Sequence, residues 1–169
     1  MPSRYLLIFP FLFSLNLGLL DNFISLNDLL RENRIYYYEK GSKAVSGPVK
    51  TFWANGFVEN TGNLKAGKKE GKWEYFHKNG KLRASGSYTE GKKTGGWITF
   101  FNNGNKRTSE NYIEGKRTGI WELNYRSGKI RTKEEYKNGK LQGIWQFFLE
   151  SGELIESGFQ KDGVRDGLL

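Results

Sequence analysis

The chain has 169 residues, a formal net charge of +9 and a hydrophobic content of 37%. It contains 22 glycines, no cysteine and a single histidine. Such a composition favours half-buried strands and turns over packed helices, and it excludes disulfides, thiol chemistry and cysteine-based metal sites. We therefore expect one all-β domain that holds no metal and no cofactor.

The first 20 residues have the pattern of an export segment. Arg4 precedes an apolar stretch from Tyr5 to Leu20, and Asp21 ends it; a basic start followed by an apolar run is typical of a signal peptide. A helix of that length would span about 24 Å, less than a hydrocarbon core of about 30 Å. Because no clear cleavage site follows, residues 1–20 are predicted to be a signal peptide or a membrane anchor, and the protein to be periplasmic or extracellular.

Residues 21–42 are expected to connect this segment to the main domain. Five apolar residues follow an approximately helical spacing, at Phe23, Ile24, Leu26, Leu29 and Leu30. The spacing predicts a short linker helix over residues 22–33 that caps a sheet, followed by a lead-in strand. The repeat domain is expected to occupy residues 43–169.

A 24-residue repeat fills that domain. Four units begin at Gly67 (unit 1), Gly91 (unit 2), Gly115 (unit 3) and Gly139 (unit 4), and a weaker leading unit covers residues 43–66. The structural marks of the repeat are the tryptophans Trp73, Trp97, Trp121 and Trp145 and the glycines Gly80, Gly104, Gly128 and Gly152. A fixed period of this kind indicates supersecondary units that stack on their neighbours.

The dipeptide Asn79-Gly80, repeated one unit later, predicts the turn of each hairpin. Asn-Gly between two alternating segments favours a two-residue type I′ turn, in which both residues have positive φ. That turn would pair His77 with Leu82. The units would then form tandem β-hairpins in an elongated antiparallel meander.

This register predicts which side chains share a face of the sheet. The tryptophan face would be covered and would also hold Leu82, Ile130 and Leu154, whereas the opposite, solvated face would hold Arg83, Arg107 and Arg131. Trp53 does not belong to the tryptophan series, because it aligns with His77.

The pattern G-x-W-x-x-(Y/F)-x-x-(N/S)-G followed by Y-x-x-G-K-x-x-G resembles the variant MORN (membrane occupation and recognition nexus) repeats over about residues 43–169. The lead-in YYYEKGSKAVSG also resembles bacterial secreted members. The resemblance implies a β-hairpin array with a binding role and no shared catalytic residues. It also implies an antitoxin-like role, since many bacterial members are labelled antitoxin components of toxin–antitoxin pairs.

His77 is the one candidate for a catalytic base. Its repeat equivalents are Phe101, Tyr125 and Leu149, so the position is expected to serve packing. Ser85 and Ser87 would lie on the opposite face, which removes a Ser-His pair from this part of the sheet. The sequence therefore predicts a protein that is not an enzyme.

Basic residues concentrate between residues 43 and 138, and three basic pairs recur in the turns that link the hairpins: Lys68-Lys69, Lys92-Lys93 and Lys116-Arg117. Two strands per unit would place these pairs about 10 Å apart along one sheet edge. The pairs either keep the turns soluble or form a ladder that binds an anion or an acidic partner.

Three functions remain open. The leading hypothesis is an exported protein-interaction module, antitoxin-like or immunity-like, with an unidentified protein partner. The alternative is peripheral binding of anionic phospholipid or an acidic envelope polymer through the basic ladder, and the third is a structural spacer. Nucleic acid is disfavoured, because stacking platforms need exposed rings and the tryptophans are expected in the core.

Overall fold

The computed structural model describes residues 23–161 and 164–168. The elements confirm the predicted all-β class: β1 (Ile24–Ser25), η1 (Leu26–Asp28), β2 (Leu30–Glu32), β3 (Ile35–Tyr37), β4 (Gly47–Phe52), β5 (Val58–Lys65), β6 (Lys68–Phe76), β7 (Leu82–Thr89), β8 (Lys92–Phe100), β9 (Lys106–Ile113), β10 (Lys116–Arg117), β11 (Gly119–Asn124), β12 (Ile130–Lys137), β13 (Lys140–Phe148), β14 (Leu154–Lys161) and β15 (Val164–Leu168). Within these residues no helix is long and apolar enough to cross a membrane. The predicted export segment, residues 1–20, lies outside them.

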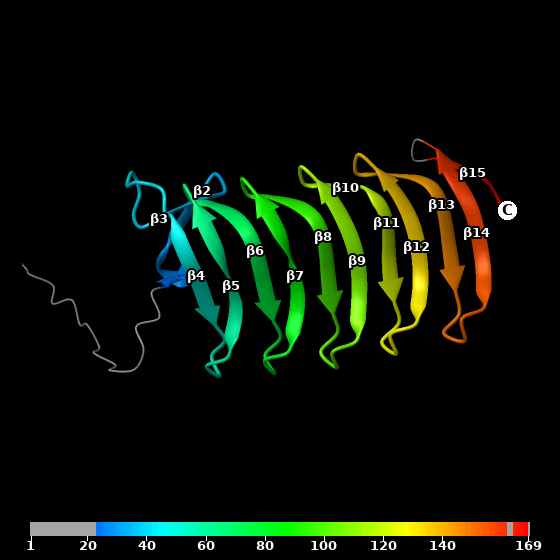
Figure 1. Ribbon diagram of the computed structural model, residues 1–169, viewed down its shortest axis with the longest axis horizontal. Helices are drawn as coiled ribbons and strands as arrows, with labels where there is room; N and C mark the ends of the chain where they lie inside the picture. Colours follow the sequence, from blue (N-terminus) through cyan, green and yellow to red (C-terminus); the bar gives the residue numbers. More distant parts are fainter. Residues whose placement is uncertain (1–22, 162–163, 169) are drawn as a thin grey trace, which may run out of the picture.

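One long sheet runs the length of the molecule, and Figure 1 shows its strands in a single curved row. The sheet has 13 strands in the order β1-β4-β5-β6-β7-β8-β9-β11-β12-β13-β14-β15, with β10 paired to β9. From β4 onward neighbouring strands are antiparallel, so the predicted meander is confirmed. Each unit can bury its side chains only against neighbouring units, as in other repeat arrays.

The predicted helix over residues 22–33 is wrong. In its place β1 pairs in parallel with β4, a single 3₁₀ turn follows, and β2 and β3 form a small separate hairpin. The turn of this hairpin has positive φ at both Asn33 and Arg34, as in a type I′ turn. Of the apolar residues with helical spacing, Ile24, Leu26 and Leu29 pack onto the first strands of the sheet, and the Phe23 ring lies against Phe52, whereas Leu30 is exposed. This packing covers the edge of β4 and its apolar face.

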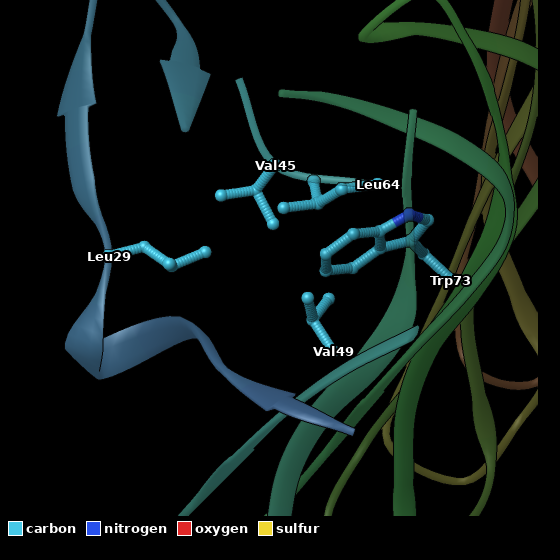
Figure 2. Packing of buried hydrophobic residues seen from close by; sticks show 5 residues of the cluster. All are labelled: Leu29, Val45, Val49, Leu64 and Trp73. Atoms are coloured by element: carbon cyan, nitrogen blue, oxygen red, sulfur yellow. The ribbon is translucent and has the colours of Figure 1, made fainter. Parts of the chain in front are cut away.

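The hydrophobic core lies where this N-terminal segment covers the leading unit. Figure 2 shows the buried cluster, which consists of Leu29, Val45, Val49, Leu64 and Trp73. Ile24, Leu26 and Tyr36 pack against the same cluster. The segment thus caps the sheet as expected, with a strand and a hairpin instead of a helix.

Two kinds of turn alternate along the sheet, and the type I′ turn predicted for the Asn-Gly turns is found in the other kind. The turns that link one unit to the next are type I′, with positive φ at both residues: Ala66-Gly67, Glu90-Gly91, Glu114-Gly115 and Asn138-Gly139. In the Asn79-Gly80 turn only Gly80 has positive φ, at 78°. The Gly80 N–H donates to the His77 carbonyl at 2.9 Å, and the His77 N–H donates to the Lys81 carbonyl at 2.8 Å. This geometry is a three-residue loop with a bulge, so the two-residue turn predicted here is wrong.

The three-residue loop pairs Phe76, not His77, with Leu82, and a one-residue shift moves a side chain to the other side of a sheet. A second irregularity at Arg83 restores the pairing of Tyr75 with Ala84, and the Arg83 guanidinium lies 5.7 Å from the centroid of the Tyr75 ring. The same register shift recurs in units 2, 3 and 4. Arg107 and Arg131 also lie over aromatic rings, those of Phe101 and Tyr125. The predicted faces are therefore wrong for Leu82, Ile130, Leu154, Arg83, Arg107 and Arg131.

The asparagines of these turns connect neighbouring units. The Asn79 side-chain amide donates to the carbonyl of Asn102 in the next unit at 3.0 Å, while its Oδ1 accepts the N–H of Lys81. Asn55 and Asn103 make the same two kinds of bond. Each asparagine thus closes its own turn and ties it to the following one.

Candidate binding surfaces

The linking turns form one continuous edge of the sheet, the turn edge, which comprises residues 66–69, 90–93, 114–117 and 138–141 (upper edge in Figure 1). The glycine N–H of each turn donates to a carbonyl of the turn before it: Gly91 to Lys69 at 2.8 Å, Gly115 to Lys93 at 2.9 Å and Gly139 to Arg117 at 2.8 Å. The structure therefore brings the six predicted binding residues into one row. The two members of each basic pair nevertheless have different surroundings.

The first member of each pair, an outer lysine, faces solvent. Lys92 and Lys116 are exposed and Lys68 is half-buried. Glu90 and Glu114 lie in the same linking turns and partly neutralise the middle of the turn edge, whereas the first linking turn has alanine at that position. Positive charge on this edge is therefore densest at its N-terminal end.

The second member of each pair, an inner cation, lies over the tryptophan face. Lys69 Nζ is 4.0 Å from a ring centroid of Trp73, Lys93 Nζ is 4.3 Å from Trp97 and Arg117 Cζ is 5.2 Å from Trp121. A tyrosine ring from the neighbouring strand completes each site. Such cation–π contacts stabilise a fold by about 0.5–2 kcal/mol, so the inner cations belong to the scaffold.

The carboxylates beside the inner cations increase from unit 1 to unit 3. One strand position flanks the tryptophans throughout the array, and it is occupied by Gly62, Gly86, Glu110, Glu134 and Gly158 in turn. Lys69 lies between two of these glycines, Lys93 beside one glutamate, and Arg117 between two glutamates. The three inner cations therefore have no, one and two glutamates at the flanking strand position.

The pKa values of the inner cations follow this series. Burial, and secondarily the nearby Arg31, lower the pKa of Lys69 to about 8. Burial also lowers the pKa of Lys93, although Glu110 opposes the change. For Arg117 the burial penalty is outweighed by hydrogen bonding to a tyrosine and by Glu110, so its pKa is raised. Lys69 is the inner cation whose charged form the protein supports least.

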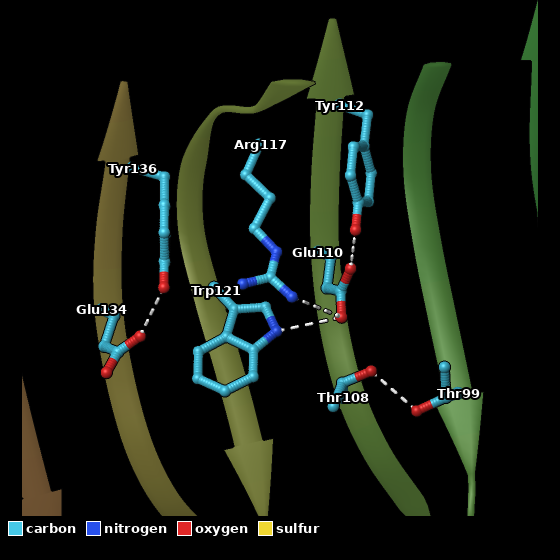
Figure 3. Close-up of polar contacts among 8 residues, drawn as sticks. All are labelled: Thr99, Thr108, Glu110, Tyr112, Arg117, Trp121, Glu134 and Tyr136. Atoms are coloured by element: carbon cyan, nitrogen blue, oxygen red, sulfur yellow. Dashed lines mark hydrogen bonds and ion pairs between the residues drawn. The ribbon is translucent and has the colours of Figure 1, made fainter. Parts of the chain in front are cut away.

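Glu110 is the centre of the polar cluster in Figure 3. Its carboxylate accepts hydrogen bonds from the Tyr112 hydroxyl and from Trp121 Nε1, the latter at 3.0 Å, and it lies 3.9 Å from the Arg117 guanidinium. Burial alone would raise the pKa of Glu110, but these bonds and the neighbouring cations lower it. The group is an ionised, well-satisfied structural carboxylate.

The four tryptophans are not equivalent. Trp73, Trp97 and Trp145 are 0%, 3% and 2% exposed, whereas Trp121 is only half-buried. The Trp97 ring lies flat on Gly86, where a Cβ atom would come within 2.2 Å of Cδ2 of the indole. At Trp121 a glutamate, Glu110, replaces that glycine, and its carboxylate accepts a hydrogen bond from the indole Nε1. Trp145 is buried although Glu134 occupies the same position beside it, so the glutamate alone does not set the exposure of the ring.

His77 and Trp53 occupy equivalent positions, as the alignment predicts. Trp53 Nε1 donates to the Phe76 carbonyl at 3.2 Å, and His77 Nε2 lies 3.0 Å from the Phe100 carbonyl. Each contact reaches 23 residues along the chain into the following unit. These contacts give His77 a structural role, and the absence of enzymatic activity stays a prediction.

The face opposite the tryptophans carries apolar side chains that the sequence analysis did not identify. Ile120 and Ile144 are 58% and 48% exposed and line one shallow hollow of about 260 Å³. Phe159 lies beside Ile144 in the adjacent strand. The Gly-Ile-Trp sequence of units 3 and 4 could have predicted these side chains. Successive residues of a strand point to opposite faces, so an isoleucine directly before a tryptophan must lie on the face opposite that tryptophan.

The comparisons with known proteins concern two of the units. A search of curated proteins found no match to the chain. Residues 69–90 of unit 1 and 117–138 of unit 3 match the family model described as a MORN repeat variant. MORN repeats are modules of protein or membrane interaction, and the bacterial, antitoxin-like association stays a prediction. Units 1 and 3 are thus MORN-like hairpins, as the sequence resemblance suggests.

Proposed function

We propose that the chain is an exported, non-enzymatic protein-interaction module whose partner presents an acidic surface to the turn edge. The observation that carries this proposal is the row of outer lysines, Lys68, Lys92 and Lys116, on turns that are hydrogen-bonded to one another. A fixed row of positive charges steers an acidic partner and sets the register in which it docks. In the antitoxin-like or immunity-like form of the proposal, that partner is a toxic protein.

Charge reversal at the outer lysines tests the proposal. Lys92→Glu combined with Lys116→Glu should abolish capture of the partner by cross-linking and pull-down in the native host, because the reversed charges repel an acidic surface. Lys93 and Arg117 are left unchanged, since they pack over tryptophan rings. Capture that is unchanged by this double reversal would contradict the proposed surface.

A matched control separates the turn edge from net charge. Lys78→Glu combined with Lys129→Glu makes the same change in net charge at the opposite edge, on exposed positions of the hairpin loops. The change at Lys78 removes only the contact of its Nζ with the Trp53 ring in the array's first loop, 5.4 Å from the ring centroid. This control should capture the same partner as the wild type. An equal loss in both double variants would assign the binding to net charge alone.

The second candidate is peripheral binding of anionic phospholipid or an acidic envelope polymer. The regular repetition of the outer lysines favours it, because a flat anionic surface has no register to match. Sedimentation with phosphatidylglycerol vesicles at low and high salt distinguishes the two, since binding through exposed lysines is screened by salt. Salt-sensitive vesicle binding that disappears in the Lys92→Glu, Lys116→Glu variant, without any captured protein, would favour this second candidate.

A further inference from the structure

A basic hollow lies at the N-terminal end of the turn edge, between the β2–β3 hairpin and the first two linking turns. The hairpin is fixed there by backbone bonds, because the Tyr36 N–H donates to the Gly67 carbonyl at 2.9 Å and the Gly67 N–H donates to the Val45 carbonyl. The hollow has a volume of about 290 Å³. It therefore lies at the lower end of the range for small-molecule sites, about 300–1,000 Å³.

The lining of this hollow is strongly positive. Its charged residues are five basic ones and one acidic one: Arg31, Arg34, Lys68, Lys69, Lys92 and Glu90. The two arginines come from the N-terminal hairpin and the three lysines from the repeats. Two parts of the chain with different sequence patterns thus bring their positive charges to one place.

Lys69 lies at this hollow without a counter-ion. Its Nζ donates to the Tyr75 hydroxyl at 2.8 Å and lies over three aromatic rings, but it makes no ion pair within the described residues. The charged group that lowers its pKa is Arg31, a like charge. A half-buried ammonium group without an ion-pair partner is stabilised by an anion that reaches it.

The equivalent lysine one unit later is a natural control for this arrangement. Lys93 also lies over a tryptophan and a tyrosine, but the Glu110 carboxylate supports its charge. In unit 1 that position is Gly86. The missing carboxylate, together with the added Arg31, leaves a positive site that the protein itself does not neutralise.

We propose that this basic hollow binds a phosphate group with two negative charges, either as free phosphate or as a phosphate monoester. A dianion matches a lining in which positive groups outnumber the single carboxylate, and guanidinium groups form paired hydrogen bonds to phosphate oxygens. The small volume admits one phosphate group with a short substituent. The hollow shares Lys68 and Lys92 with the proposed partner surface, whereas Arg31, Arg34 and Lys69 belong to the hollow alone. Loss of phosphate binding in Arg31→Gln with unchanged capture of the partner therefore distinguishes the two proposals.

Titration of the full chain with inorganic phosphate, followed by calorimetry, tests the site. Lys68→Gln and Arg31→Gln should each weaken binding about tenfold or more, since each removes a charge-assisted contact. Lys116→Gln is the matched control, because Lys116 is an outer lysine of the turn edge that does not line the hollow. The control should bind phosphate within about twofold of the wild type.

Vesicles distinguish the two sources of phosphate. Phosphatidic acid carries a phosphate monoester and phosphatidylglycerol a phosphodiester, so the site should prefer phosphatidic acid vesicles if lipid is the source, and free phosphate should compete. Binding of free phosphate without any vesicle preference assigns a soluble ligand. The proposal is overturned if phosphate fails to bind, or if Lys116→Gln weakens binding as much as Lys68→Gln. Lys92→Gln, at an exposed position of the lining, gives a second loss-of-binding variant if Arg31→Gln disturbs the hairpin.

Discussion

Units 1 and 3 place a cation over a tryptophan in the same way, yet the two cations have opposite electrostatic surroundings. Lys69 has no carboxylate beside it, and burial lowers its pKa to about 8. Arg117 lies 3.9 Å from Glu110, and its pKa is raised despite burial. The glycine positions beside Lys69 leave the cation without a counter-ion and its tryptophan is fully buried, whereas Glu110 provides the counter-ion of Arg117 and Trp121 is half-buried.

The comparison shows that a repeat can keep its period and its backbone while one position changes the chemistry of a unit. Glycine there favours close packing of the indole on the neighbouring strand. Glutamate there favours a neutralised polar cluster. A binding site for an anion is therefore expected in unit 1 and not in unit 3.

The largest expected effect is on the tryptophans. Trp73→Ala should lower the free energy of unfolding by about 3–5 kcal/mol, because it empties the centre of the capped core. Trp121→Ala should cost about 1–3 kcal/mol, since that side chain is only half-buried. Urea unfolding of both variants measures the difference, and equal losses would contradict the contrast between the two units.

The second prediction concerns Glu110, the counter-ion of Arg117 in unit 3. Glu110→Gln should cost about 1.5–3 kcal/mol at pH 7, the range for hydrogen bonds to a charged group. The folded pKa of Glu110 is lowered, so its contribution is present above the unfolded value of about 4.3 and is lost as pH falls through the folded value. The difference between wild type and variant should therefore vanish in acid. Glu114→Gln, in an exposed linking turn, should change little at any pH.

A difference that persists unchanged at pH 3 would show that the Glu110 position acts through side-chain shape instead of charge. The comparison of units would then rest on packing alone. Urea unfolding at several pH values provides the measurement.

The third prediction concerns Lys69. Its pKa is about 8 in the folded chain, against an ordinary value of 10.5 for the unfolded chain. Between these values the unfolded chain binds a proton that the folded chain does not, so the free energy of unfolding rises with pH in that window. Below about pH 8 the full penalty is present. Lys69→Leu, which copies Leu141 of unit 4, removes this titration. From about pH 7.5 to about pH 9.5 the wild type should therefore gain stability relative to the variant.

A control at Lys116 completes this test. Lys116→Leu removes an exposed lysine, so its stability difference from wild type should be flat over the same pH range. A flat difference for Lys69→Leu as well would mean that Lys69 is fully hydrated, and it would remove the electrostatic contrast with Arg117.

The repeat period made the sheet predictable, and the equivalence of Trp53 and His77 followed from it. The hairpin turn type was not predictable, because Asn-Gly suits both a two-residue turn and a bulged three-residue loop. The one additional residue in the three-residue loop decides on which face of the sheet Leu82 lies. An error of one residue in the turn therefore places Leu82, and its equivalents in the other units, on the wrong face.

The N-terminal segment and the inner cations were mispredicted for a different reason. The helical spacing of Leu26 and Leu29 does not reflect a helix, because each of these residues packs separately onto the first strands. Likewise, both lysines of Lys68-Lys69 precede a tryptophan in sequence, and only the folded strand shows that Lys69 packs on the Trp73 ring while Lys68 takes the outer position, where it is half-buried. These features depend on contacts between distant residues, so no local pattern encodes them.

The smallest expected effect lies at the edge opposite the linking turns, where the turn of unit 1 has Asn79 and that of unit 3 has Ser127. Asn79→Ser removes the side-chain bond to the Asn102 carbonyl and should cost about 0.5–1.5 kcal/mol. Ser127→Ala should change stability by less than about 0.5 kcal/mol, as for an ordinary exposed position. Thermal unfolding of both variants checks this. Equal costs would mean that backbone bonds alone hold these turns together, and that units 1 and 3 differ only around their inner cations.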